Sequence, residues 1–396
     1  MRKTSRSSKV TTTSEGSTKD ELMQSVQTKL ERMANQTNDD SFLPDDSEQL
    51  VELIKVELLN KKLIKEIISI SDLSREEIKD IVSSYYQTQN MRMALRSQQR
   101  AIENSKKNNN SINATILNYM AKQFAIIEKS INDALTIIVS ENTVGKWLLQ
   151  INGIGPVIAA GCLSYFDVTG KSYASQFHSY AGLNDNNRPW IGRIGAQRIM
   201  DELLKDNPVI DNDFVTKYAA KTQWKYEYLR SSAYDEDTDT WSKTALVKAA
   251  SKIPYNANLK VLCHKIGTSF SWLINKPKSK YGRLLAERKV LETQRNEEHA
   301  YAEQAARILE TKRIDKSTVA YSAYIKGMLP KAHINARCER WVTKIFISHL
   351  FEEMYRVKYN KLPPAYYALV PEYMGNQHNK YIEPEVPFTP VPEDNA

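Results

Sequence analysis

The sequence predicts a mainly α-helical, multi-helical protein with a central helix-hairpin-helix module, a long N-terminal helical hairpin or coiled coil, and disordered termini. Three observations lead to this expectation. Apolar residues recur every three or four positions in the N-terminal half, a tight Gly-Ile-Gly-Pro turn joins two apolar runs near residue 150, and both ends of the chain are polar. With 396 residues, of which 41% are apolar, the chain is long enough to bury a sizeable core.

The N-terminal part consists of a polar arm followed by helical runs. Residues 1–48 are poor in core-forming side chains and are expected to be disordered, and their first residues carry no apolar signal core. Residues 50–68 are apolar at helical spacing, and a second periodic run follows Ser74-Arg-Glu-Glu77, a capping-box signature. A third run, at 112–139, keeps steps of three and four, which is typical of a hairpin helix or coiled coil. We expect the apolar side of this helix either to pack in the core or to join copies of the chain in a homo-oligomer.

The run from Trp147 to Gly161 predicts a helix, a very tight turn and a second helix. Gly153 and Gly155 can take backbone angles that other residues avoid, Pro156 suits a first helical turn, and Ile154 is left to be buried between the helices. The turn and the N-terminus of the second helix would offer backbone N–H groups and a positive dipole end to a phosphate oxygen. The alternative is a helix turn that only packs.

The segment after this hairpin combines glycine, arginine and tryptophan. Arg188, Arg193 and Arg198 follow one another at five-residue intervals, and Trp190 lies between the first two. Guanidinium groups bind phosphate with two parallel hydrogen bonds, and an indole can stack on a base. We expect the arginines to contact a nucleic-acid backbone, and Trp190 either to stack or to anchor the loop on the core.

Basic residues are concentrated in the second half of the chain. Residues 243–344 contain 21 Lys or Arg and 8 Asp or Glu, whereas residues 383–396 contain four acids and no base. His333, Arg337, Arg340 and Lys344 are spaced four, three and four apart, so on a helix they share one face. We expect that face to meet a polyanion, against the alternative of a solvated helix. No carboxylate or cysteine cluster surrounds the histidines, so we expect no metal site.

The three cysteines, Cys162, Cys263 and Cys338, are widely separated, and this spacing suits neither a zinc site nor a disulfide framework. No run of apolar residues is long enough for a helix to span a bilayer. We therefore expect a protein of a reducing compartment that does not enter a membrane. The expected location is the cytoplasm of a cell or host cell, in association with the nucleoid.

The order of these motifs resembles the C-terminal domain of the DEDD-type insertion-sequence transposases, which are guided by a bridge RNA. The resemblance covers residues 145–205. It rests on Gly-Ile-Gly-Pro, then Phe177 and Tyr180-Ala-Gly182-Leu183, then Gly192-Arg193-Ile-Gly195 before a helix. The second half is similar to stand-alone transposase-like relatives in phages and other mobile elements, through Glu287-Arg288-Lys289, His333-Ile-Asn-Ala-Arg337 and Leu362-Pro363-Pro364.

Two departures from this family bear on catalysis. The resemblance implies an N-terminal nuclease-like domain with four metal-binding acids, but residues 1–145 are expected to be helices and a polar arm. It also implies a nucleophilic serine beyond the Gly-Leu pair, where this chain has Trp190 or Ile191. We therefore assign no catalytic residue and no cofactor, and Mg²⁺ would be needed only if the chain transfers strands after all.

These observations define six expected regions and a function. The expected function is sequence-independent or structure-selective DNA binding by a transposase-like protein of a mobile element or phage, with structured RNA as a further partner. The alternatives are an active transposase or recombinase that performs strand transfer, and a structural or assembly protein. The regions are a disordered arm at 1–48, a helical region at 49–145, the helix-hairpin-helix domain at 146–235, a basic connector at 236–282, a basic helical region at 283–370, and a Pro-rich acidic tail at 371–396.

Overall fold

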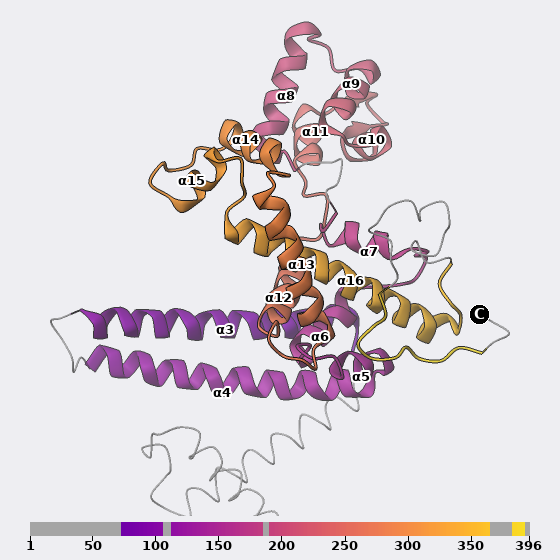
Figure 1. Ribbon diagram of the computed structural model, residues 1–396. Helices are drawn as coiled ribbons and strands as arrows, with labels where there is room; N and C mark the ends of the chain where they lie inside the picture. The colour runs from indigo at the N-terminus through magenta and orange to yellow at the C-terminus, as the bar shows by residue number, and fades with distance from the viewer. Residues whose placement is uncertain (1–72, 106–111, 185–189, 365–381, 393–396) are drawn as a thin grey trace, which may run out of the picture. The chain divides into compact units, whose positions relative to one another are not determined.

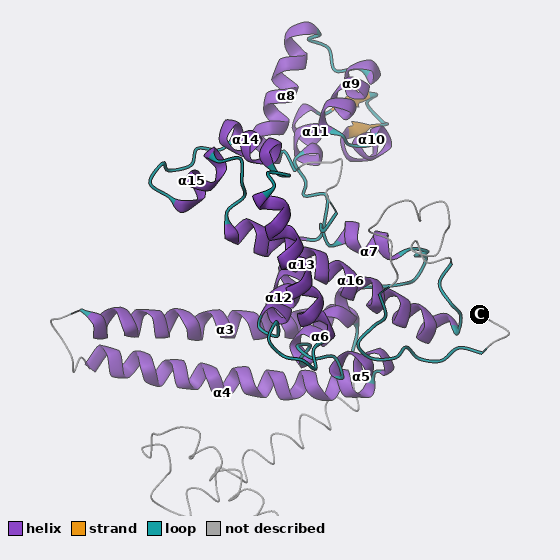
Figure 2. Cartoon of the chain, in the orientation of Figure 1, coloured by secondary structure: helices purple, strands orange, loops and turns teal. Residues whose placement is uncertain are grey.

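The computed structural model describes residues 73–105, 112–184, 190–364 and 382–392, and it is built mainly from α-helices. Within these residues, strand occurs only as a short antiparallel pair (Figure 2). The predicted mainly helical fold class is therefore confirmed. In chain order the elements are α3 (Arg75–Asn104), α4 (Ile112–Glu141), α5 (Thr143–Leu149), α6 (Pro156–Tyr165), α7 (Ala174–Tyr180), α8 (Gly192–Asp206), α9 (Asn212–Thr222), α10 (Tyr226–Ala233), β1 (Tyr234–Asp235), β2 (Thr240–Trp241), α11 (Lys243–Ala250), α12 (Ala257–Ser271), α13 (Lys280–Glu297), α14 (Ala302–Thr311), α15 (Val319–Ile325) and α16 (Lys331–Tyr359).

Several expectations concern residues outside these ranges. The polar arm at 1–48, the apolar run at 50–68, Arg188 and part of the acidic tail at 371–396 lie outside the described residues. Their predicted structure and roles stay predictions. Among the residues that are described, no helix is both long enough and apolar enough to cross a membrane.

Helices α3 and α4 form a long antiparallel hairpin, as expected for this part of the chain (Figure 1). α3 begins at the predicted capping box: the Glu77 N–H donates to Ser74 Oγ at 3.3 Å, and the Ser74 N–H donates to Glu77 Oε2 at 2.7 Å. The Ser74 hydroxyl, which donates to Glu77 Oε2 at 2.7 Å, and then the Ser74 N–H hold the pKa of Glu77 below its ordinary value. Between the two helices, Arg92 Nε donates to Glu128 Oε2 at 2.5 Å. This ion pair links α3 to α4 in addition to their apolar contacts.

Two hydrophobic clusters lie along the chain. The first gathers buried residues from α3 to α7, from α12 to α14 and from α16, and the second gathers those of α8 to α11. The hairpin helices α5 and α6 belong to the first cluster. The region expected to be one domain at 146–235 is therefore divided between two cores, and the expected connector at 236–282 supplies α11 to one and α12 to the other.

A buried histidine on α16 holds the segment 382–392 against the first cluster. His349 is 1% exposed and lies 2.8 Å from the Tyr281 hydroxyl and 2.7 Å from the Ile382 carbonyl. Because a carbonyl only accepts, Nε2 donates to Ile382, and in the neutral ring with this tautomer Nδ1 accepts from the Tyr281 hydroxyl. Burial lowers the pKa of His349 to about 4, in agreement with that pairing.

The free energy of unfolding should fall between pH 7 and pH 5, because His349 stays neutral in the folded protein. In the unfolded chain its pKa returns to about 6.5, so only the unfolded state takes up a proton in this range, which amounts to about 2 kcal/mol for one such group. Urea unfolding at both pH values should show a smaller pH effect in His349→Gln, by about that amount.

His264→Gln is the comparison variant for this measurement, since the His264 side chain is 73% exposed and its Nδ1 lies 3.9 Å from Glu339 Oε2. Because exposed ion pairs contribute little, it should change the pH effect of the parent protein much less than His349→Gln does. An equal pH effect in the parent and in His349→Gln would contradict a neutral, buried His349.

Candidate nucleic-acid interface

The Gly-Ile-Gly-Pro stretch forms the predicted hairpin between two helices. α5 ends at Leu149, α6 begins at Pro156, and the Ile154 N–H donates to the Ile151 carbonyl at 3.1 Å, which closes a tight turn. Ile154 is 4% exposed and belongs to the first hydrophobic cluster. The expected hairpin with a buried isoleucine is therefore present.

Gly153 is needed because the turn packs closely against the end of α12. Its φ of 92° lies in the region that favours glycine, and a Cβ there would come within 2.8 Å of Leu273 Cδ1. Its carbonyl accepts a hydrogen bond from Ser269 Oγ at 2.6 Å. The Gly153 carbonyl is thus bonded internally and the Ile154 N–H is taken by the Ile151 carbonyl, so the predicted contact of Gly153 with phosphate would have to come from its own N–H and stays a prediction.

Gly155 differs from Gly153 both in its backbone angle and in the space around it. It is exposed, its φ of −88° suits any residue, and a Cβ placed on it would meet nothing within 4 Å. It is the N-cap of α6 but no side chain caps that helix. Since Pro156 has no N–H, the first donors of α6 are those of Val157 and Ile158, and no described residue accepts from them outside the helix. The N-terminus of α6 therefore has donors that no described residue caps, between an exposed Gly155 and a buried Val157.

A loop between α12 and α13 flanks the same turn and was not singled out in the sequence. Asn152 Nδ2 donates to the Lys278 carbonyl at 3.4 Å, and both Lys276 and Lys278 are exposed. Trp272, at the start of this loop, is 82% exposed. The signal available in the sequence was a tryptophan followed closely by three lysines, Lys276, Lys278 and Lys280. The exposure of the indole, which is unusual for a large aromatic side chain, came only from the structure.

A carboxylate from the C-terminal segment also touches the hairpin. Glu385 Oε1 accepts from the Asn152 N–H at 2.7 Å and from Asn152 Nδ2 at 2.6 Å. Its other oxygen, Oε2, accepts from the Lys280 N–H at 2.7 Å. Nothing in the sequence pointed to this contact, because Glu385 follows the hairpin by more than 230 residues.

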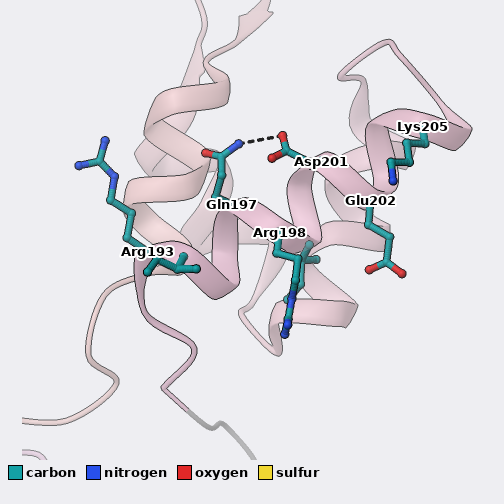
Figure 3. A pocket seen from close by; sticks show the side chains of 8 residues that line it. Arg193, Gln197, Arg198, Asp201, Glu202 and Lys205 are labelled. Atoms are coloured by element: carbon teal, nitrogen blue, oxygen red, sulfur yellow. Dashed lines mark hydrogen bonds between the residues drawn. The ribbon is translucent and has the colours of Figure 1, made fainter.

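The arginines after the hairpin diverge on α8. Arg193 and Arg198 are both exposed. A step of five residues on a helix turns the direction of the side chain by roughly 140° beyond a full turn. Figure 3 accordingly shows the two side chains pointing in different directions. The hollow that they line also contains Asp201, which accepts from Gln197 Nε2 at 2.8 Å, and Glu202. The expected arginine row is therefore mixed with acids.

Trp190 is partly anchored by its indole. Nε1 donates to the Ser251 carbonyl at 3.0 Å, and the residue is 56% exposed. The anchoring contact corresponds to the alternative in which Trp190 holds its loop to the core. The exposed part of the ring is accessible to a base, and the stacking of Trp190 on a base stays a prediction.

Arg337 does not contribute a free charge to the predicted basic face of α16. Its Nε donates to Glu292 Oε2 at 3.0 Å, and its guanidinium lies 4.4 Å from the centre of the Tyr301 ring. Glu292 is 1% exposed and also pairs with Arg288 at 2.5 Å. Burial opposes its ionisation, but hydrogen bonds from Tyr301 and Arg337 hold the pKa of Glu292 below its ordinary value. Arg337 is needed to neutralise that buried carboxylate.

The other three members of this face differ in exposure. Arg340 is exposed, whereas His333 and Lys344 are half-buried. Burial, and then the charges of Arg337, Arg340 and Lys312, lower the pKa of His333. His333 therefore takes up a proton less readily than an ordinary histidine, and Arg340 is the exposed member of this face.

Residues with metal-binding or nucleophilic chemistry do not gather in the described part of the chain. No group of three or more His, Cys, Asp or Glu residues there could hold a metal ion. The three cysteines are free and buried, and burial raises the pKa of the Cys263 thiol to about 12 and that of Cys338 to about 11. These thiols are poor nucleophiles at neutral pH.

Substitution of the two hairpin glycines should have opposite effects on stability. Gly153→Ala should lower the free energy of unfolding by about 1–3 kcal/mol, through the positive φ and the contact with Leu273. Gly155→Asn should raise it by a few tenths to about 1 kcal/mol, because an asparagine at the N-cap can accept from the free donors of α6. Chemical unfolding of both variants measures this, and an equal loss in the two would contradict the described turn.

Comparison of the chain with protein-family models, with curated proteins and with solved structures finds no match. The resemblance to insertion-sequence transposases therefore stays an expectation from the motifs alone. What the protein does has to be argued from the residues described above.

Proposed function

We propose that the protein binds nucleic acid through the sugar-phosphate backbone, with DNA as the first partner and structured RNA as the second, as a transposase-like protein of a mobile element or phage. The observation that carries this proposal is the open N-terminus of α6, where Gly155 is exposed and no side chain caps the helix. Backbone donors at a helix N-terminus bind phosphate without reading a base, so the proposed binding is independent of sequence.

The loop beside the hairpin supports the same proposal. Lys276 and Lys278 put two positive charges next to the turn, and Trp272 offers an uncovered ring on which a base can stack. Arg340 on α16 and the exposed Arg193 and Arg198 on α8 supply further positive charge for the proposed partner.

Gly155→Asp should weaken DNA binding about tenfold, which corresponds to roughly 1.4 kcal/mol. The aspartate would occupy the donors of α6 from within the chain and would repel phosphate, while the helix itself gains a cap. Fluorescence anisotropy with several unrelated duplexes measures the dissociation constants, and the loss should be the same for each duplex.

Gly155→Ala is the matched control, because it adds a Cβ without charge or acceptor in a place where nothing lies within 4 Å. It should bind like the parent. A folded Gly155→Asp protein that binds all duplexes as tightly as the parent would remove the hairpin from the proposed interface.

We also propose that the protein forms a homo-oligomer through α4. Five large apolar residues of this helix are exposed by 42% to 63%: Ile116, Tyr119, Met120, Ile126 and Ile127. Tyr119 and Ile126 lie roughly 160–180° round the helix from Glu128, the residue that bonds to α3. α4 therefore has one apolar side on α3 and a second that no described residue covers, and a helix that is apolar on two sides is normally buried on both.

The order of residues on this face suits a second copy. Counted from Gln123, apolar residues lie three and four positions away in both directions, at Met120 and Tyr119 on one side and at Ile126 and Ile127 on the other. A two-fold axis through Gln123 of two antiparallel α4 helices would place each apolar pair opposite the other and the two glutamines together. A polar pair at such an axis sets the register of the helices.

Ile126→Glu should dissociate the oligomer, because it would bury a carboxylate in an apolar seam close to the axis. Sedimentation equilibrium of the parent should show a dimer, and the variant should sediment as a monomer at the same concentration. Ile126→Leu, which keeps an apolar side chain of similar size at the same position, is the control and should stay dimeric. A parent protein that sediments as a monomer would refute the homo-oligomer.

A further inference from the structure

The carboxylate of Glu385 is held at the hairpin by three donors from two segments of the chain. The Asn152 N–H and side-chain amide donate to one oxygen at 2.7 and 2.6 Å, and the Lys280 N–H donates to the other at 2.7 Å. Two of the three are backbone donors, and the Lys280 N–H belongs to the first residue of α13. Backbone N–H groups of this kind donate to a phosphate oxygen as they do to a carboxylate oxygen.

The segment that carries Glu385 is fastened by contacts on its far side. Trp147 Nε1 donates to the carbonyls of Val386 and Pro387, each at 3.2 Å, and the Trp147 ring stacks on Phe388 with centres 6.1 Å apart. The Thr389 N–H donates to the buried Glu353 at 2.9 Å. These contacts hold the segment in place without Glu385, so the carboxylate can leave its donors while the backbone around it stays docked.

Glu385 lies beside the donors proposed for DNA. Asn152 is inside the turn that the bond from the Ile154 N–H to the Ile151 carbonyl closes, and Gly155 follows directly after this turn. A turn of this kind keeps Cα atoms three positions apart within about 7 Å of each other. Glu385 is thus bonded to a residue of the same short turn that leads into α6, and charges near one another on a protein surface interact over about 8 Å at physiological salt.

We propose that Glu385 acts as an internal substitute for a phosphate group and restrains nucleic-acid binding at the hairpin. The inference rests on the proposed function of the hairpin, and it adds a second set of donors and a regulatory element to it. A phosphodiester that arrives at α6 displaces the carboxylate from Asn152 and Lys280 and takes up these donors. Binding then depends on how readily Glu385 swings out.

Glu385→Gln removes the charge and keeps the size of the side chain. Like charges separated by roughly 8 Å, about one Debye length, repel enough to change an affinity by about twofold in a water-like medium and by more than tenfold at the lower effective dielectric of a protein surface. Anisotropy titrations with a labelled 20-base-pair duplex should therefore show Glu385→Gln binding at least about twofold more tightly than the parent.

Glu383→Gln is the matched control. It changes the net charge by the same amount two residues away, but the Glu383 side chain is 80% exposed and its carboxylate lies 3.9 Å from Lys280 Nζ rather than on the turn. The logarithm of the dissociation constant should change by less than half as much in Glu383→Gln as in Glu385→Gln. Equal gains in the two variants would overturn the proposal, because net charge alone would then explain them.

A second readout separates this inference from the proposed function. Inorganic phosphate is titrated into the parent and into Glu385→Gln, and the amide resonances of Asn152 and Lys280 are followed. Both resonances should shift with saturation in the variant and stay in place in the parent. If no protein binds DNA but these shifts occur, the proposed function fails and the anion site stands. If DNA binds the parent and Glu385→Gln equally, or if the resonances do not move in the variant, the inference about Glu385 fails and the hairpin assignment stands.

Discussion

The packing of the hairpin turn against the end of α12 decides which part of the hairpin meets solvent. Gly153 turns its carbonyl to Ser269 at 2.6 Å and leaves no room for a side chain beside Leu273. Because that side of the turn is covered, the chain leaves it with Gly155 exposed and with the first donors of α6 uncapped. One close contact between backbone and helix thus leaves the exposed end of the turn, at Gly155, as the part of the hairpin proposed to meet a phosphate at α6.

Much of the positive charge in the second half of the chain is used inside the molecule. Glu292, at 1% exposure, pairs with Arg288 and Arg337, and the Arg288 guanidinium also lies 5.1 Å from the centre of the Trp341 ring. Removing either arginine would leave a buried carboxylate short of a partner, which is among the costly changes to a protein core. The excess of basic residues therefore overstates the charge that is left for a partner.

The C-terminal segment brings acidic and neutral groups to the same region. Glu385 contacts the hairpin, while His349 on α16 holds the Ile382 carbonyl through a neutral ring. Both contacts join residues that are far apart in the sequence, so a segment that follows α16 in the chain completes the hairpin. α4 shows the opposite situation, because its second apolar side, with Tyr119 and Ile126, is left open by the described residues.

The sequence by itself determined the local features of this protein. Helical spacing predicted α3 and α4, Ser74 and Glu77 predicted the start of α3, and the glycines and proline predicted the hairpin with Ile154 inside, because each of these depends on neighbours within a few residues. Only the tertiary structure decided which candidate residues are available. Arg337 faces a carboxylate 45 positions away, Gly153 faces α12, and Glu385 reaches Asn152 across 233 positions. Helical periodicity places residues on a face but does not say what that face packs against, since the partner comes from elsewhere in the chain.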